Sequence, residues 1–284
     1  MVVSTGPSFV SIRVHPRFKN LLVSIRVMPK FAANLSWLYQ ERSFLERFDA
    51  AARSGFKAVE FLFPYQFGPA EIAASLGNAG LRAVLFNLPP GDFEKGDRGI
   101  AAIPGREKEF RDSVQLALEY ASVLGVGRLH VMAGIVPAME LERARATFLS
   151  NLEFALGETN DRDVLILVEP INSRDIPGYF LSTIEQAAAI LTEIKHPRLK
   201  IQLDWYHAQI MGGDLTRRTE RFFSDVAHIQ VAGVPDRGEP DQGEVHFSYL
   251  FRLVDQLAYE GWIGCEYKPA AKTEDGLSWL KPWL

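Results

Sequence analysis

The feature that most constrains this chain is a regular alternation of short apolar runs, rich in β-branched residues, with longer amphipathic stretches. This alternation is typical of repeated strand–helix units around a parallel sheet. Each interval between runs has room for one helix and two loops, and no break divides the series into domains. The eight runs cover Phe31–Leu35, Ala58–Leu62, Arg82–Asn87, Arg128–Gly134, Val164–Pro170, Lys200–Trp205, Val226–Ala232 and Trp262–Lys268. The sequence therefore predicts an α/β protein with a single (β/α)8, or TIM, barrel.

The stretches between the runs carry helix signals. Over residues 106–124 apolar side chains recur at three- and four-residue spacing, and Gly125 provides a stop. Ser182 with Glu185 predicts a capping box for another helix, and 147–156 and 247–258 have the same periodicity as 106–124. A doubly wound sheet is the structural alternative. It is disfavoured because no glycine-rich dinucleotide-binding loop follows the first run.

The first 27 residues differ from the rest of the chain. They contain Arg and Lys but no Asp or Glu, a bias that mimics a targeting peptide. However, residues 10–18 and 23–31 match at seven of nine positions, and a local duplication explains that match better. We expect 1–27 to be a short N-terminal extension outside the core, with Met28 as the original start, and 28–284 to form the catalytic barrel.

The net charge and composition exclude several classes of binding partner. A formal charge of −4 makes the chain a poor electrostatic match for nucleic acid or anionic membranes, which attract clustered Lys and Arg. No apolar run approaches the roughly 18 residues of a membrane helix, and the single cysteine, Cys265, allows no internal disulfide. We expect a cytoplasmic protein that binds a small molecule, with no nucleic acid or membrane partner. Assembly into a homo-oligomer stays open.

Polar residues end four consecutive runs, where a barrel carries its chemistry. They are Glu169, Asp204, Gln230 and Glu266. Three carboxylates at one barrel mouth repel one another and are costly to bury unless a cation compensates their charge. Oxygen donors of this kind suit one hard divalent ion such as Mg²⁺ or Mn²⁺. The alternative is that each residue pairs separately with Arg or Lys on the barrel rim.

The motifs around these residues carry a resemblance. Val-Glu-Pro-Ile-Asn at 168–172, Gln-Leu-Asp-Trp-Tyr-His at 202–207, the stretch 228–240 and Gly-Cys-Glu-Tyr-Lys-Pro at 264–269 resemble the hydroxypyruvate isomerase family, within the xylose isomerase-like barrels. The similarity runs over nearly all of the chain beyond residue 31. It implies one divalent metal held by Glu169, Asp204, Gln230 and Glu266, with Glu169 and Glu266 also acting as the acid/base pair.

The resemblance also bears on the substrate. Related sugar epimerases have a histidine where this sequence has Gln230, and the glutamine points to the hydroxypyruvate branch. That branch includes isomerases of four-carbon 2-oxo acids. The reaction that it implies interconverts hydroxypyruvate and 2-hydroxy-3-oxopropanoate (tartronate semialdehyde) through a cis-enediolate. A chelating metal stabilises the charge that develops on oxygen, and two carboxylates on opposite sides of the substrate serve as base and acid.

Four further residues are candidate substrate contacts: Asn87, His207, Arg237 and Lys268. Arg237 offers a bidentate fork to a substrate carboxylate, or it pairs with Glu239 or Asp241 in its own loop. His207 is alternatively a hydrogen-bonded rim residue. Lys268 either holds the substrate, pairs with a ligand carboxylate or forms a Schiff base. Asn87, like Glu60, has the alternative of hydrogen bonding within the rim.

Several other residues have two interpretations each. His130 and His228 lie inside apolar runs, where histidines in the core or behind the site are the simpler interpretation. The loop 91–99 has the glycines and charges of a mobile lid, and also those of a plain surface loop. Trp37 and Phe63 form either an apolar wall over the substrate or part of the core.

Other functions compete with the isomerase. One is an epimerase or isomerase of free sugars in the same superfamily, and another is a class I aldolase that uses Lys268. A barrel that binds a sugar acid without catalysis is the non-enzymatic alternative. A DNA-repair endonuclease is disfavoured, because six scattered histidines suit a multi-zinc site poorly and no basic groove is evident.

Overall fold

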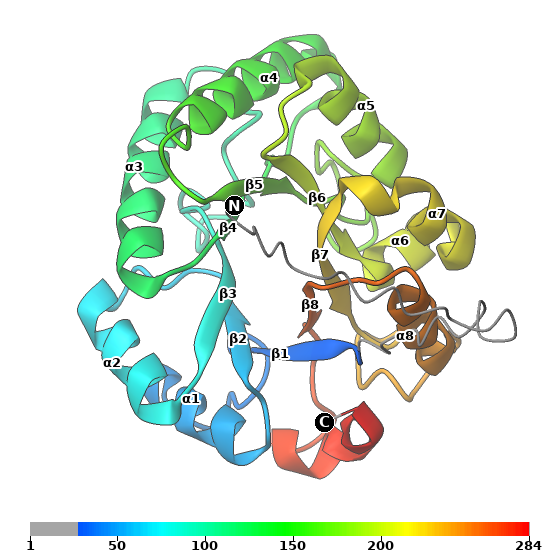
Figure 1. Ribbon diagram of the computed structural model, residues 1–284. Helices are drawn as coiled ribbons and strands as arrows, with labels where there is room; N and C mark the ends of the chain where they lie inside the picture. The colour runs from blue at the N-terminus through cyan, green and yellow to red at the C-terminus, as the bar shows by residue number, and fades with distance from the viewer. Residues whose placement is uncertain (1–27, 284) are drawn as a thin grey trace, which may run out of the picture.

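The computed structural model describes residues 28–283, so the predicted extension over 1–27 lies outside the described residues. A closed barrel of parallel strands, ordered β1 to β8, forms the centre, and helices surround it (Figure 1). The predicted (β/α)8 barrel is confirmed. The doubly wound alternative is excluded because the sheet closes, with β1 paired in parallel to β8.

The strands follow the apolar runs closely. They are β1 Lys30–Asn34, β2 Ala58–Phe61, β3 Arg82–Asn87, β4 Arg128–His130, β5 Leu165–Val168, β6 Leu199–Asp204, β7 Val226–Val231 and β8 Trp262–Cys265. Nearly all of their residues are buried, because the barrel interior covers one face and the helices cover the other. The carboxyl ends of all eight strands consequently meet at one mouth.

The helices form the outer layer. They are α1 Phe44–Arg53, α2 Pro69–Ala79, α3 Glu107–Leu124, α4 Leu141–Gly157, α5 Ile184–Ile194, α6 Trp205–Gly212, α7 Leu215–Phe222 and α8 Phe247–Gln256, with short 3-10 segments at Ala138–Glu140, Phe223–Asp225 and Thr273–Trp283. The predicted helix over 106–124 is confirmed: Phe110, Val114 and Ala117 are buried, and Gly125 ends α3 with a φ of 64°. No helix between residues 28 and 283 has both the length and the apolarity needed to cross a membrane.

The start of α5 differs from the prediction by one residue. The N-cap is Thr183 rather than Ser182, and its partner is Gln186 rather than Glu185. Thr183 Oγ1 accepts the Gln186 backbone N–H at 3.2 Å, and the Gln186 side chain accepts the Thr183 N–H at 3.1 Å. Gln completes a capping box as well as Glu does, so the sequence offered two overlapping boxes.

Candidate active site

A cavity of about 400 Å³ opens at the carboxyl ends of the strands. It is lined by residues at or after the end of each of the eight strands: Trp37, Leu62, Asn87, Met132, Glu169, His207, Arg237 and Glu266. All four predicted substrate contacts and both predicted acid/base residues are among the lining residues. The structure therefore brings most of the predicted site together at one place. Asp204 and Gln230 are buried and are not among the lining residues.

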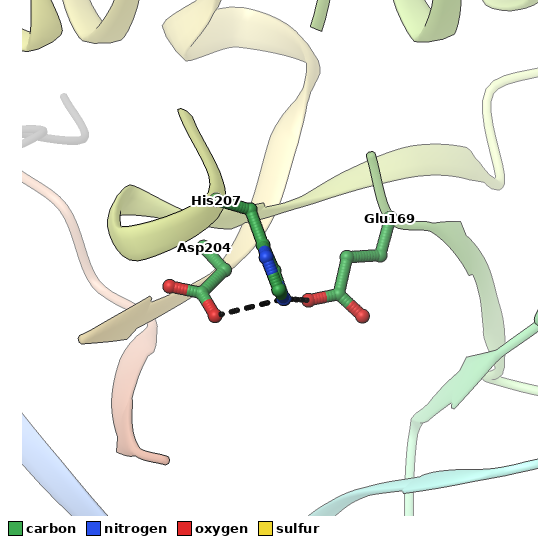
Figure 2. Close-up of side chains that lie close together, drawn as sticks. All are labelled: Glu169, Asp204 and His207. Carbon is green, nitrogen blue, oxygen red and sulfur yellow. Dashed lines mark ion pairs between the residues drawn. The ribbon is translucent and has the colours of Figure 1, made fainter. Parts of the chain in front are cut away.

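Glu169, Asp204 and His207 form a cluster that is suited to a metal ion. Figure 2 shows the two carboxylates on either side of the imidazole, and one ligand atom from each residue lies within 4.8 Å of the others. Glu169 Oε1 and Asp204 Oδ2 are buried and have no hydrogen-bond partner among the described residues. Buried carboxylate oxygens without a partner are costly. A divalent cation would satisfy both, so these donors fit the group that the sequence implies.

The carboxylates of the site hold protons more tightly than exposed ones. Burial raises the pKa of Glu169 well above its ordinary value, and the nearby Glu266 and Asp204 raise it further. Burial also raises the pKa of Glu266 to about 8 and that of Asp204 to about 6, against the opposing effect of Arg237. Because a bound cation favours the ionised forms, it would lower all three pKa values.

The guanidinium of Arg237 provides the positive charge among these acids. Its Nη2 donates to Glu266 Oε1 at 2.7 Å and lies 3.6 Å from Asp204 Oδ2. The group also lies over the rings of Trp37, 4.4 Å from the centroid, and Tyr206, 5.0 Å away. Arg237 is thus fixed by acids on other strands and by two aromatic faces.

The loops after β7 and β8 are joined to each other. The Lys268 N–H donates to the Arg237 carbonyl at 2.8 Å, and the Ala270 N–H donates to Glu239 Oε1 at 3.0 Å. A Cβ at Gly276 would lie 2.5 Å from the same Glu239 oxygen. The alternative in which Arg237 pairs with Glu239 is therefore wrong: Glu239 ties the two loops together instead.

Gln230 connects the site to a buried polar layer. Its Nε2 donates to Glu266 Oε2 at 2.5 Å and to Glu60 Oε1 at 2.7 Å, and its Oε1 accepts from Gln202 Nε2 at 2.6 Å. The amide group thus turns its N–H bonds toward the acids. Ligation of a metal through Oε1 requires the carboxamide to turn over, and the ligand role of Gln230 stays a prediction.

Glu60 was expected to hydrogen-bond within the barrel rim, and it is hydrogen-bonded, although inside the barrel rather than on the rim. It is fully buried inside the barrel, 2.6 Å from His228 Nε2, and it accepts from Asn34 Nδ2 at 3.0 Å. Asn34 also donates to Glu266 Oε2 at 2.9 Å. The absent side chain of Gly264 leaves room for the Glu60 carboxylate, since a Cβ there would lie 2.2 Å from Oε1.

His207 is held as a neutral donor. Burial, with Arg237 nearby, keeps its pKa well below the ordinary value. Its Nδ1 accepts the backbone N–H of Asn172 at 3.3 Å, so the proton of the neutral ring is on Nε2. That nitrogen lies 3.6 Å from Asp204 Oδ2 and 3.9 Å from Glu169 Oε1. This tautomer presents an N–H to the cavity, and metal ligation through Nε2 requires the opposite one.

His130 lies behind Glu169. Its Nδ1 is 3.5 Å from Glu169 Oε2, and burial lowers its pKa to about 3, so the ring is neutral. The expectation that His130 and His228 lie in the core or behind the site is confirmed, since neither is exposed.

The remaining residues with two interpretations are Lys268, Asn87, Trp37 and Phe63. Lys268 is exposed, whereas a Schiff-base lysine is usually activated by burial or by a neighbouring cation. Asn87 is buried apart from its face to the cavity. Trp37 is a wall of the cavity, and Phe63 contacts Phe93 of the loop 91–99, with 5.3 Å between ring centroids.

Comparison with known proteins decides the family. Residues 48–283 match the family model of the xylose isomerase-like TIM barrels. The chain belongs to the xylose isomerase-like TIM barrel family. Within this family it is 53% identical to the 2-oxo-tetronate isomerase of Cupriavidus necator, over 90% of this chain and 99% of that protein. It is 44% identical to the hydroxypyruvate isomerase of Escherichia coli, over 90% of this chain and 100% of that protein.

These relatives confirm the resemblance to the hydroxypyruvate isomerase branch and make this family member an isomerase. A solved structure from Brucella melitensis, described as an AP endonuclease of family 2, has 48% sequence identity and a TM-score of 0.89. It covers 90% of this chain, which covers 99% of that one. The fold described above is therefore shared with an experimental structure of similar length.

Proposed function

We propose that this protein interconverts a small 2-oxo acid and its hydroxy-oxo isomer, with hydroxypyruvate or the four-carbon 2-oxo-tetronate as substrate. Both names belong to its relatives of 44% and 53% identity. The observation that carries the proposal is the pair of buried oxygens on Glu169 and Asp204 that accept no hydrogen bond from the described residues. They lie beside a cavity of about 400 Å³, which has room for a three- or four-carbon acid.

A divalent cation, Mg²⁺ or Mn²⁺, is part of the proposal. The ion would be held by Glu169, Asp204, Gln230 and Glu266. His207 would be a metal ligand in place of Gln230 if Gln230 does not bind the ion. The fit rests on hard oxygen donors whose burial is compensated only in part by Arg237. When bound, the ion would supply a Lewis acid for the negative charge that develops on the substrate oxygens.

Glu169 and Glu266 are the proposed proton carriers. Glu169 follows β5 and Glu266 follows β8, so they approach a ligand in the mouth from different strands. One removes a proton from the hydroxyl-bearing carbon, and the other delivers a proton to the neighbouring carbon of the cis-enediolate. Burial raises the pKa of both carboxyl groups in the metal-free site, and a bound cation would lower both pKa values toward the ionised form that a general base needs.

Two hydrogen-bond donors, one neutral and one positively charged, assist Glu169 and Glu266. The Nε2–H of His207 and the guanidinium of Arg237 face the same cavity, and hydrogen bonds from them stabilise an oxygen that becomes negative. Trp37 and Tyr206 keep the Arg237 fork in one orientation. The substrate would therefore meet donors whose orientation is already fixed.

The test is proton NMR of the purified protein in D₂O with hydroxypyruvate and, separately, 2-oxo-tetronate. We expect isomer formation with deuterium incorporation in Mg²⁺ or Mn²⁺ and none in EDTA. Glu266→Gln should slow turnover by about 10²- to 10⁴-fold, the usual contribution of a general acid or base. Turnover of free sugars but of neither acid would contradict the proposal and favour a sugar isomerase.

A second candidate function follows from the description of the Brucella structure as an AP endonuclease. Incision of a duplex that contains one abasic site, assayed under the same metal conditions, would support it. The formal charge of −4 opposes binding to a phosphate backbone.

The aldolase alternative predicts irreversible labelling by substrate and borohydride, lost in Lys268→Gln.

A further inference from the structure

A substrate carboxylate in this cavity needs a cation, and three side chains that line the cavity carry one: Arg98, Arg237 and Lys268. Arg237 is already engaged. It donates to Glu266, lies 3.6 Å from both Asp204 Oδ2 and Asp175 Oδ2, and contacts two aromatic rings. A second anion at this guanidinium would have to compete with the acids of the reaction centre. The carboxylate is therefore better bound elsewhere in the mouth.

Arg98 has donors to spare. Its Nη1 donates to the carbonyls of Phe93 and Asp97, at 3.0 Å and 2.7 Å, and its guanidinium lies 3.9 Å from the centroid of the Phe93 ring. These contacts orient the group, yet within residues 28–283 no carboxylate forms an ion pair with it. Because guanidinium has five N–H donors, Nη2 and Nε remain for a ligand.

The loop that carries Arg98 is closed on itself. The Gly99 N–H donates to the Pro90 carbonyl at 3.0 Å, and Asp97 Oδ2 accepts both the Asp92 N–H and Arg106 Nη1, each at 2.7 Å. This loop over 91–99 thus presents Arg98 from a fixed base. Lys268, in contrast, is an exposed ammonium on a flexible stem.

Barrel topology puts the loop that carries Arg98 across the mouth from Arg237. The loop follows β3, and Arg237 follows β7. In a closed barrel of strands in sequential order, β3 and β7 face each other across the mouth, as Figure 1 shows. Asn87, at the end of β3, lines the cavity on the same side as Arg98.

We propose that Arg98 is the specificity-determining residue that binds the substrate carboxylate, with Asn87 beside it, so that the reacting carbons lie toward Glu169 and Glu266. This inference rests on the proposed function and names the part of the substrate that the β3 side recognises. It assigns the acid specificity of the enzyme to the loop 91–99 rather than to Arg237.

The experiment compares Arg98→Gln with Lys95→Gln. Lys95 lies in the same loop, carries the same charge and is largely exposed, with 84% of its side chain accessible, so it is a matched control for charge and loop position. For hydroxypyruvate we expect KM to rise about 30-fold in Arg98→Gln, as for loss of a charge-assisted hydrogen bond. We expect kcat to change by less than about 3-fold. The KM of Arg98→Lys should lie between those of the wild type and Arg98→Gln, because lysine keeps the positive charge and loses the two-pronged guanidinium.

Two further readouts separate a binding role from a structural one. Dihydroxyacetone has a hydroxymethyl group in place of the carboxylate. With this compound as substrate, Arg98→Gln and Lys95→Gln should have the same kinetic constants. Calorimetric titration with tartronate should show weaker binding to Arg98→Gln only. If Arg98→Gln matches Lys95→Gln with both anions, or if it impairs dihydroxyacetone equally, the inference is wrong. If the wild type binds tartronate through Arg98 yet isomerises no acid, the proposed function fails and the carboxylate site stands.

Discussion

At the scale of single residues, the barrel mouth is dominated by carboxylates that are buried without enough positive charge. The raised pKa values of Glu266 and Asp204, about 8 and about 6, have burial as their main cause. In the unfolded chain these groups release their protons near pH 4. Between the pKa values of the unfolded and folded states, the folded metal-free protein binds more protons than the unfolded chain. Its free energy of unfolding therefore falls as pH rises through this range.

We therefore expect the melting temperature of the EDTA-treated protein to fall between about pH 5 and pH 8, and Glu266→Gln to flatten this fall. Thermal unfolding followed by circular dichroism over that pH range measures it. Glu71→Gln is the control, because Glu71 is exposed at the start of α2. A melting temperature that rises over the whole range in the wild type would show that these carboxylates are ionised in the metal-free fold.

Residue-level prediction succeeded where a polar residue ends an apolar run. Glu169 and Glu266 were predicted on that ground, and both line the cavity. For Glu60 it gave the hydrogen bonding but not the partners: this residue lies within β2 and contacts His228, 168 residues away, inside the barrel. Arg98 was also missed, because a charged residue in a glycine-rich loop has no periodic signal. Contacts between distant strands depend on barrel closure, which the sequence does not express locally.

At the scale of elements, strands and helices were predictable because each has its own periodicity and lies between glycine or proline signals. The loop 91–99 was not, since its charges fit a lid and a surface loop equally. The structure shows a loop that lines the cavity through Phe93 and Arg98 and is tied by hydrogen bonds at its base. Two glycines within it allow a matched test of that closure.

Gly99→Ala should destabilise the protein by at least about 1 kcal/mol more than Gly96→Ala. Both glycines have positive φ, 102° and 105°. They differ in space: a Cβ at Gly99 would lie 2.3 Å from the Met132 carbonyl oxygen, whereas a Cβ at Gly96 meets nothing within 4 Å. Urea unfolding of the two variants measures the difference. Equal free energies of unfolding would mean that the loop moves away at no cost.

At the scale of the whole molecule, a metal ion would join strands that are far apart in the sequence. Because the proposed ligands come together only in the closed barrel, the ion binds the folded chain alone and stabilises it by mass action. At a concentration of about 100 times Kd the gain is roughly 2.7 kcal/mol, which raises the melting temperature by about 5 °C or more.

Differential scanning calorimetry with Mg²⁺ or Mn²⁺ near pH 7.5, and again after EDTA, tests this expectation. Asp204→Asn should lose most of the shift, and Glu71→Gln should keep it. The shift should shrink toward pH 5, because protons then compete for the same oxygens. A metal shift that is unchanged in Asp204→Asn would place the ion elsewhere on the molecule.

Because the loops after β7 and β8 are joined, residues outside the barrel mouth can affect the active site. Gly276 does not line the cavity, yet a side chain there would push Glu239. Glu239 accepts the Ala270 N–H, and the Lys268 N–H donates to the Arg237 carbonyl, so both contacts join the loop of Arg237 to the loop after β8. Random mutagenesis should therefore recover position 276 among kinetic variants, although it lies in a peripheral 3-10 segment. The exposed Ser278 on the same segment should tolerate substitution, so that position 276 is constrained by an arginine that it does not touch.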